Sequence, residues 1–183
     1  MKLMRSIVRK LSCLITLIIL ALVGHNIATR YTEPPVEYLD IIIRYSQEYT
    51  VEKTLIQAVI QCESSYDPDA VSPVGACGLM QLTEETFYDV RKMVNDSDEI
   101  TFDTHSFDPE INIKYGTKYL SYLSIIYDGD IYKVLAAYNA GMGNVNAWID
   151  ENNTLKIENI EFPETKDYVE KVLKTQQKYR DRT

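Results

Sequence analysis

The stretch that decides the fold spans residues 61–82 and reads Gln-Cys-Glu-Ser-Ser-Tyr-Asp-Pro-Asp-Ala-Val-Ser-Pro-Val-Gly-Ala-Cys-Gly-Leu-Met-Gln-Leu. It joins the end of an apolar segment to a loop that contains two prolines and two glycines. Upstream, apolar residues recur at three- and four-residue steps, which predicts a helix over residues 52–63 with one buried face. Pro68 disfavours helical backbone at Asp67, so we expect this helix to end soon after Glu63.

Glu63, at the end of this helix, has the position of a general acid. It lies on the flank of the apolar stripe, and burial disfavours a charged carboxylate and therefore raises its pKa. The negative end of the helix dipole acts in the same direction. An acid that stays protonated near neutral pH can donate its proton to a leaving group. These residues alone fit a surface glutamate that merely ends a helix equally well.

The loop after Glu63 has features that suit contact with a ligand. Gly75 and Gly78 permit positive φ angles or a close approach of the backbone to another group. Gln81 is polar within an otherwise apolar run, so its amide needs a partner. That partner is either backbone in the core or a hydroxyl group of a bound ligand.

Three blocks of sequence, in this order, resemble the soluble lytic transglycosylase family. The blocks are Glu63-Ser64-Ser65-Tyr66 through Gly78-Leu79-Met80-Gln81-Leu82, then Ala136-Ala137-Tyr138-Asn139-Ala140-Gly141 with Gly143-Asn144-Val145, and Pro163-Glu164-Thr165-Lys166-Asp167-Tyr168-Val169. The resemblance covers roughly residues 36–180, and three ordered blocks are far more specific than any one of them. The chain departs from the family at Thr83-Glu84, where members often have Met-Pro and the methionine lines the sugar groove.

The resemblance implies a mainly α, lysozyme-like single domain with a substrate groove. Members cut peptidoglycan between N-acetylmuramic acid and N-acetylglucosamine and leave a 1,6-anhydro ring on the muramic acid. The resemblance carries one catalytic acid, matched here by Glu63, which serves as general acid and then as general base. It implies no metal and no cofactor.

The resemblance also implies a set of substrate-binding residues around Glu63. These residues are Ser72, Gln81, Tyr138, Asn139, Glu164 and Tyr168. From the residues alone, the tyrosines are equally typical of core packing, and Asn139 suits a helix cap beside Gly141. Asp67 and Asp69 are candidates for a second catalytic carboxylate, but a turn beside Pro68 explains them more simply.

Two other functions stay open beside the lytic transglycosylase. One is a lysozyme-type hydrolase on the same fold, in which water completes the reaction. The other is a non-catalytic wall-binding accessory of an envelope-spanning secretion or conjugation machine. Such a machine is also a candidate partner for an active enzyme.

Residues 1–30 read as a membrane segment. They contain five basic residues and no acidic residue, and an uncharged, largely apolar run extends over residues 11–28. The basic side is N-terminal, which predicts a single-pass anchor with the catalytic domain outside the cytoplasm. A cleaved signal peptide, which would release a secreted protein, is the alternative, although no good cleavage site follows. Residues 31–35 form a proline-containing linker, and residues 36–183 form the lytic transglycosylase domain.

The charge distribution excludes one class of partner. Residues 31–183 carry 14 basic and 27 acidic residues, a net charge of −13. Binding to nucleic acid requires a basic face, so we expect no nucleic-acid partner. Residues 95–107 are predicted to form a solvated acidic loop, because their spacing matches no pattern of metal ligands.

The remaining segments are predominantly helical, with weak strand signals throughout. We predict helices over 36–49, 52–63, 83–94, 109–127, 130–140, 145–151 and 164–179. Cys62 and Cys77 form an even pair on the outer side of the membrane, so a disulfide between them is a candidate, with two buried thiols as the alternative.

Overall fold

The computed structural model describes residues 35–182. The chain divides into two compact units, and the described residues belong to the second, which begins at Pro34. The predicted membrane segment and all of the linker except Pro35 therefore lie outside the described residues. None of the described helices is both long and apolar enough to cross a membrane.

The described part of the chain is mainly helical, as predicted, and its β-structure is limited to two isolated bridges. The helices are α2 (Val36–Tyr49), α3 (Lys53–Glu63), α4 (Glu84–Val94), α5 (Phe102–His105), α6 (Pro109–Ile126), α7 (Ile131–Ala140), α8 (Met142–Trp148) and α9 (Pro163–Arg180), with a 3-10 turn, η1, over Ile157–Asn159.

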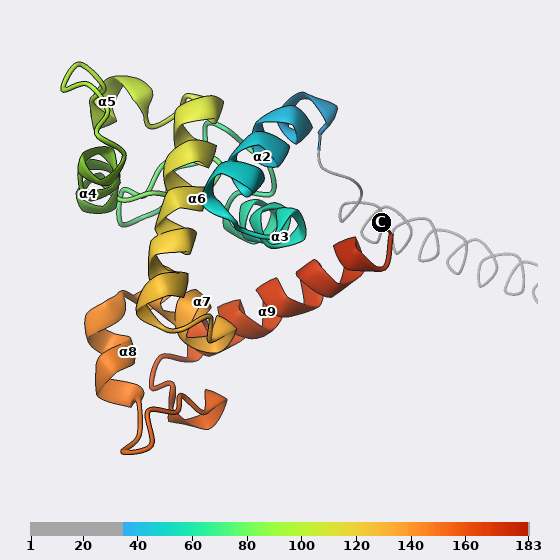
Figure 1. Ribbon diagram of the computed structural model, residues 1–183, viewed down its shortest axis with the longest axis vertical. Helices are drawn as coiled ribbons and strands as arrows, with labels where there is room; N and C mark the ends of the chain where they lie inside the picture. Colours follow the sequence, from blue (N-terminus) through green and yellow to red (C-terminus); the bar gives the residue numbers. More distant parts are fainter. Residues whose placement is uncertain (1–34, 183) are drawn as a thin grey trace, which may run out of the picture. The chain divides into compact units, whose positions relative to one another are not determined.

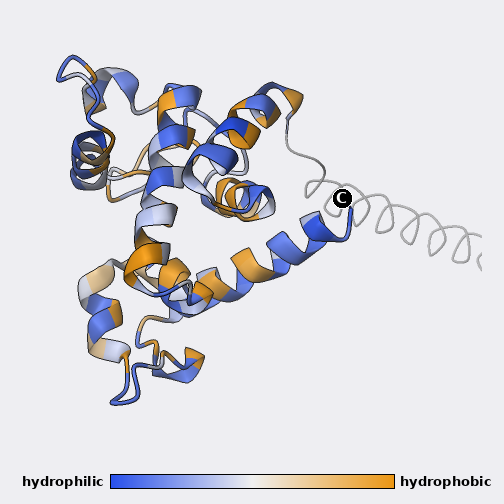
Figure 2. Cartoon of the chain, viewed as in Figure 1, coloured by the Kyte–Doolittle hydropathy of each residue, from blue (hydrophilic) through white to orange (hydrophobic). Residues whose placement is uncertain are grey.

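Helix α6 runs through the middle of the described unit (Figure 1). Helices α2 and α4 pack against it, and α7 contacts its C-terminal part. Helix α9 packs along α3 and α7, so it joins the helix that ends at Glu63 to the helix that contains Tyr138 and Asn139. Apolar residues gather on the inward faces of these helices, while the C-terminal end of α9 is hydrophilic (Figure 2).

The apolar core consists of two clusters. The larger one joins the buried faces of α2, α3, α6, α7 and α9, and Ile56, Val59 and Ile60 of α3 are fully buried in it. The smaller one centres on Phe87 of α4 and Tyr115 of α6, whose ring centroids are 4.8 Å apart. Burial of side chains of this size stabilises a fold by about 1.5–3 kcal/mol each. The core therefore fixes the end of α3 from several directions.

Three of the predicted helix starts have side-chain caps, those of α4, α6 and α7. Asp108 accepts a hydrogen bond from the amide of Ile111 at 2.9 Å, and Pro109 occupies the first turn of α6. Thr83 caps α4, and Asp130 caps α7. Each cap satisfies amide groups that the first helical turn leaves without intrahelical partners.

Two predictions about the fold are wrong in detail. Residues 95–107 are not simply a solvated loop: they contain α5, and Asp96 is largely buried in an ion pair with Lys114 at 2.7 Å. The helix predicted over 145–151 is instead α8, which begins directly after Gly141. Gly143 lowers the helix propensity of that first turn, so the sequence pattern did not predict the start of α8. Packing of Val145 and Trp148 in the core outweighs this cost.

Candidate active site

Glu63 is the last residue of α3, and its side chain is only partly exposed. Burial raises the pKa of its carboxyl group from 4.5 to about 7, although Tyr168 and Lys171 act in the opposite direction. At neutral pH the protonated and charged forms are therefore present in similar amounts. A group with this pKa can both donate and accept a proton near neutral pH.

The chain reverses direction directly after Glu63. Ser65 and Tyr66 have φ angles of 55° and 66°, a left-handed conformation that side chains other than glycine rarely adopt. The Ser64 hydroxyl donates to the carbonyl of Leu79 at 2.8 Å, and the Tyr66 hydroxyl donates to Gln57 at 3.2 Å. These bonds attach both ends of the loop to α3 and hold the carboxylic acid at a fixed position.

Asn112 on α6 holds the other side of this loop, and sequence reasoning did not single it out. Its amide nitrogen donates to the carbonyls of Cys77 and Ser106 at 3.0 and 2.8 Å, and its amide oxygen accepts from Met80 at 2.7 Å. Asn112 is fully buried. An asparagine placed at a buried position of an apolar helix face is the signal that could have identified it.

Gly78 has to be glycine for two reasons. Its φ angle is 77°, as the sequence suggested for a glycine in this loop. In addition, a Cβ atom there would lie 2.3 Å from the Asn112 amide nitrogen and 2.5 Å from the Ser106 carbonyl oxygen. The loop backbone at Gly78 therefore packs directly against the Asn112 side chain of α6.

Two phenols accompany Glu63, of which Tyr138 is partly buried and Tyr168 is buried. Tyr138 of α7 donates a hydrogen bond to the Met80 carbonyl at 2.9 Å, and burial together with the Glu63 charge raises its pKa. Tyr168 of α9 is buried, and burial together with the Glu63 charge raises its pKa. The Tyr168 phenol favours the charged form of Glu63, although within residues 35–182 no hydrogen bond of normal geometry reaches its hydroxyl group. The structure thus brings these three predicted residues together.

Ser72 and Gln81 are both occupied by bonds within the loop. The Ser72 oxygen accepts from the Ala76 amide at 3.0 Å, which leaves its hydroxyl proton for another partner. The Gln81 amide nitrogen donates to Ala70 and Gly78 carbonyls at 3.0 and 2.9 Å. Only the amide oxygen of Gln81 remains to contact a ligand.

Asn139 and Glu164 lie where α7 meets the start of α9. Asn139 accepts a hydrogen bond from Thr165 at 2.7 Å, and Gly141, with a φ angle of 85°, rather than Asn139, occupies the cap position of α7. Glu164 is exposed in the first turn of α9. Asn139 therefore joins α7 to α9.

Lys171, one turn after Tyr168 on α9, is a residue that sequence reasoning missed. Its ammonium group donates to the Cys62 carbonyl at 3.3 Å, at the C-terminal end of α3. Its positive charge lowers the pKa of Glu63. Its position three residues after Tyr168 is the signal that could have identified it, because residues three apart lie on the same face of a helix.

The candidate disulfide is not formed in this structure, because both cysteines are free. The Cys62 thiol contacts the Thr175 hydroxyl on α9 at 3.7 Å, and the Cys77 thiol contacts the Gly75 carbonyl at 3.5 Å. The two thiols thus face different elements.

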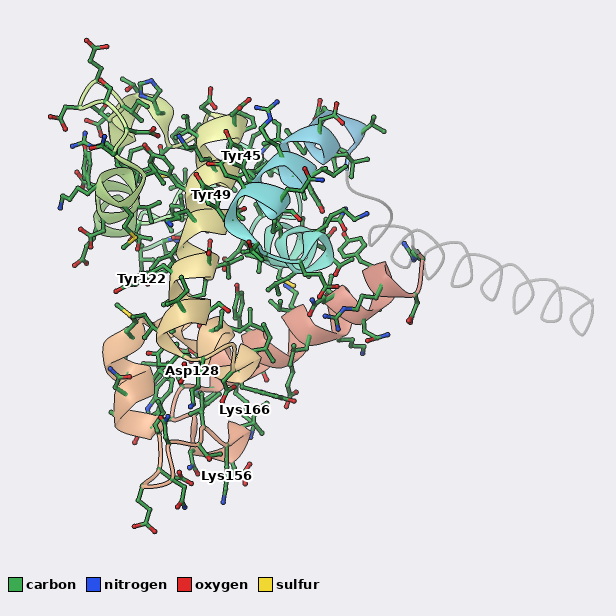
Figure 3. The ribbon with its side chains drawn as sticks, in the orientation of Figure 1. Tyr45, Tyr49, Tyr122, Asp128, Lys156 and Lys166 are labelled. Atoms are coloured by element: carbon green, nitrogen blue, oxygen red, sulfur yellow. The ribbon has the colours of Figure 1, made fainter. Side chains whose placement is uncertain are left out.

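A groove of about 440 Å³ lies beside Tyr138. Its walls come from α4, α6, the end of α7 and the start of α8, and include Thr83, Tyr119, Tyr122 and Asn139. Tyr138 belongs both to this wall and to the surroundings of Glu63, so it connects the groove with the acid. Figure 3 shows Tyr122 on α6, above the α7–α8 region.

A helical domain with one partly buried carboxylic acid, two phenols beside it and an adjoining groove has the architecture of a lysozyme-like fold. The sequence pattern described as "Transglycosylase SLT domain" matches residues 40–161. The chain therefore belongs to this family, which confirms the resemblance found in the sequence.

Known proteins of this family are similar to the chain along most of its length. The soluble lytic murein transglycosylase of Salmonella typhimurium is 34% identical over 151 residues, which are 80% of this chain and 23% of that protein. The membrane-bound lytic murein transglycosylase C of Photorhabdus laumondii is 43% identical over 117 residues, which are 60% of this chain and 32% of that protein.

Solved structures of lytic transglycosylases share the fold. One of them is an inactive mutant of the lytic transglycosylase Slt from Pseudomonas aeruginosa, in which a glutamate is replaced by glutamine. It is 31% identical, with a TM-score of 0.73, over 81% of this chain and 24% of that one. The chain thus spans about a quarter of the length of this structure and of the Salmonella relative.

Proposed function

We propose that this protein is a peptidoglycan lytic transglycosylase that cleaves the β-1,4 bond between N-acetylmuramic acid and N-acetylglucosamine. The observation that carries the proposal is the state of Glu63, whose pKa is raised to about 7 by burial beside two phenols. Membership of the SLT family and the names of its relatives support the choice of substrate.

The reaction begins with Glu63 in its protonated form. It donates its proton to the glycosidic oxygen, while the acetamido oxygen of the muramic acid attacks the anomeric carbon from the opposite face. The Tyr138 and Tyr168 phenols lie beside the carboxylate that this step leaves behind. Glu63 then accepts the proton of the muramoyl 6-hydroxyl, and that oxygen attacks the anomeric carbon, which breaks the bond to the acetamido oxygen and closes the 1,6-anhydro ring. Atoms and charges balance without water.

A mechanism with one carboxylate fits the surroundings of Glu63. The described side chains that shift its pKa are Tyr168 and Lys171, and neither is a carboxylate. Asp67 and Asp69 are exposed, and Asp67 accepts a hydrogen bond from the Asp69 amide at 3.0 Å, as a turn residue does. The inactivity of the Pseudomonas relative after one Glu-to-Gln change supports the dependence on a single glutamate.

Product analysis tests this proposal. The full chain and its Glu63→Gln variant are incubated with purified peptidoglycan, and the released fragments are analysed by mass spectrometry. We expect 1,6-anhydro-muramoyl ends from the wild type and roughly 100- to 10,000-fold slower release from the variant. Reducing muramic ends would instead establish a lysozyme-type hydrolase, and binding without cleavage would establish a wall-binding accessory.

We also propose that residues 11–28 anchor the protein in the cell membrane, with the catalytic domain outside the cytoplasm. The uncharged run, the preceding basic residues and the name of the membrane-bound Photorhabdus relative support this location. Mass spectrometry of the mature protein tests it, because a mature N-terminus near Thr29 would contradict an anchor.

A further inference from the structure

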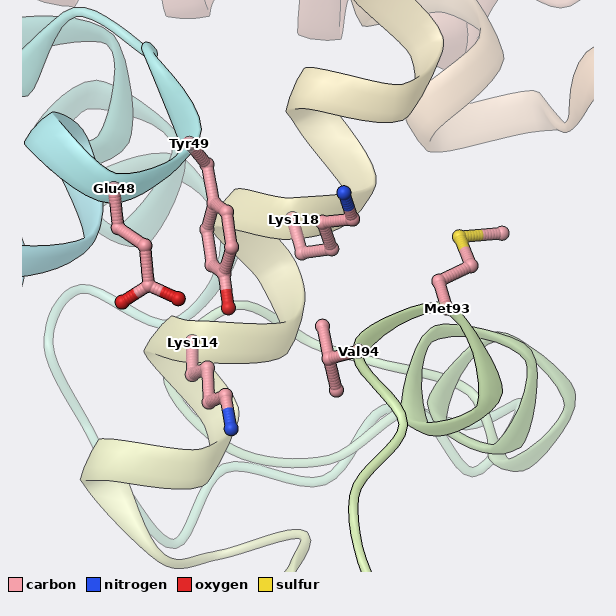
Figure 4. Close-up of a pocket in the computed structure, with 6 residues that line it drawn as sticks. All are labelled: Glu48, Tyr49, Met93, Val94, Lys114 and Lys118. Carbon is pink, nitrogen blue, oxygen red and sulfur yellow. The ribbon is translucent and has the colours of Figure 1, made fainter.

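A second pocket lies between the end of α2, the middle of α6 and the end of α4 (Figure 4). It encloses about 230 Å³. Its lining residues are Glu48, Tyr49, Met93, Val94, Lys114 and Lys118. Neither the proposed reaction nor the family blocks in the sequence use any of these residues.

The charges in this pocket are unevenly paired. Lys114 is neutralised by Asp96, with both carboxylate oxygens within 2.8 Å of its ammonium group. Lys118 instead lies over the ring of Tyr49, 5.4 Å from its centroid. Among residues 35–182, neither Lys118 nor Glu48 takes part in an ion pair. Burial raises the pKa of the Tyr49 hydroxyl, and Glu48, which faces that group, raises it further. The pocket therefore offers one positive and one negative charge that no ion pair neutralises.

The pocket adjoins the groove beside Tyr138. Met93 lines both the pocket and the groove. In addition, Lys118 in the pocket is followed on α6 by Tyr119, which lines the groove. A ligand that lies in the groove could therefore extend a side branch into the pocket.

We propose that this pocket binds the amino-acid zwitterion, an adjacent ammonium and carboxylate, at the free end of a peptide branch on the glycan. The carboxylate would pair with Lys118, supported by the Tyr49 ring, and the ammonium group would pair with Glu48. A neutral sugar would use neither charge, and a polyanion would meet repulsion from Glu48 and Asp96. This inference rests on the proposed function, because the branch is that of peptidoglycan.

A binding experiment with a small peptide tests the inference independently of cleavage. The probe is the N-acetylated tripeptide L-alanyl-γ-D-glutamyl-meso-diaminopimelate, in which the last residue supplies the only ammonium group. Its binding to the full chain is measured by calorimetry, and the contacted amides are identified by NMR. The variants are Glu48→Gln, Lys118→Met and Lys118→Arg, with Lys156→Met as a matched control that lies far from Tyr49 (Figure 3).

We expect NMR shifts at the pocket and about tenfold weaker binding for Glu48→Gln and for Lys118→Met, since each loses one charge-assisted contact. Lys118→Arg should retain most of the affinity, and Lys156→Met all of it. Two modified peptides identify the pairs. Acetylation of the diaminopimelate ammonium should weaken binding to the wild type but should not weaken binding to Glu48→Gln further. Amidation of the adjacent carboxylate should likewise weaken binding to the wild type but should not weaken binding to Lys118→Met further.

Two results would overturn the inference. One is a peptide that fails to bind, or binds Lys118→Met as tightly as the wild type. The other is sensitivity to Lys118 without any effect of Glu48→Gln or of acetylation, which would make the pocket an anion site. Loss of cleavage in the wild type would contradict the proposed function alone, because peptide binding is measured without turnover.

Discussion

The replacement Glu63→Gln should remove activity and at the same time stabilise the protein at alkaline pH. In the folded protein the pKa of Glu63 is about 7, whereas an unfolded chain has the ordinary value of 4.5. Below pH 4.5 the carboxyl group is protonated in both states and contributes no difference. Between pH 4.5 and 7 the unfolded chain loses its proton first, so the wild type loses stability as the pH rises.

The size of this effect follows from the difference in pKa. About 2.5 units correspond to about 3 kcal/mol, and partial exposure of the side chain makes this an upper value. Glutamine has the shape of the protonated acid and does not titrate. The variant should therefore match the wild type at pH 4 and exceed its free energy of unfolding by up to about 3 kcal/mol at pH 8. For a chain of this size that is roughly 10 °C in melting temperature.

Urea unfolding of both full chains at half-unit steps between pH 4 and 8 measures this difference. Cleavage of purified peptidoglycan is followed in parallel. A stability difference that does not change between pH 5 and 8 would refute the raised pKa, even if the variant were inactive. A variant that is more stable at pH 8 but still active would refute the role of Glu63 in the reaction.

Three further predictions concern the support of this acid. Lys171→Met should move the alkaline limb of the pH profile of kcat/KM to higher pH, because a positive charge that lowers the pKa of the acid is lost; Lys174→Met should leave the limb in place, and equal shifts in both would contradict the assignment. Asn112→Ala should lower the free energy of unfolding, measured in urea, by about 2–4 kcal/mol, because three buried hydrogen bonds are lost. A change below about 1 kcal/mol would rule out that these bonds hold the loop against α6. Gly78→Ala should cost about 3 kcal/mol or more by the same assay, since it adds a clash to a positive φ. Gly143→Ala, in open space within α8, should instead stabilise the protein by about 0.5–1 kcal/mol, because alanine has the higher helix propensity; equal effects of the two changes would contradict this packing argument.

Local sequence patterns were sufficient for the helices that begin with a side-chain cap. Asp108 followed by a proline predicted the start of α6, and Gly141 predicted the end of α7. The short helices α5 and α8 were missed or shifted because tertiary contacts stabilise them. Phe102 of α5 packs against Phe87 at 5.6 Å, and Trp148 of α8 packs against Phe162 at 5.1 Å. A pattern read along the chain does not contain such contacts.

The same division applies to the candidate site. The resemblance identified the residues that gather at Glu63, because they lie within recognisable blocks. It did not identify Asn112 or Lys171, which lie outside those blocks and reach the site through bonds to backbone carbonyls. A hydrogen bond to a backbone carbonyl leaves little trace in the sequence. Any residue at the acceptor position supplies the same carbonyl oxygen, so only the donor side chain is specific.

The sequence by itself determined the helical class, the position of Glu63 at a helix end and its place in an ordered set of family blocks. It also determined that an acid there would tend to keep its proton, because the neighbouring residues of the helix are apolar. Only the tertiary structure decided how far the pKa of Glu63 is raised. The pKa near 7 depends on burial by the loop, α7 and α9, with Tyr168 and Lys171 opposing it. Burial is a property of packing between segments distant in the chain, and local sequence does not fix it.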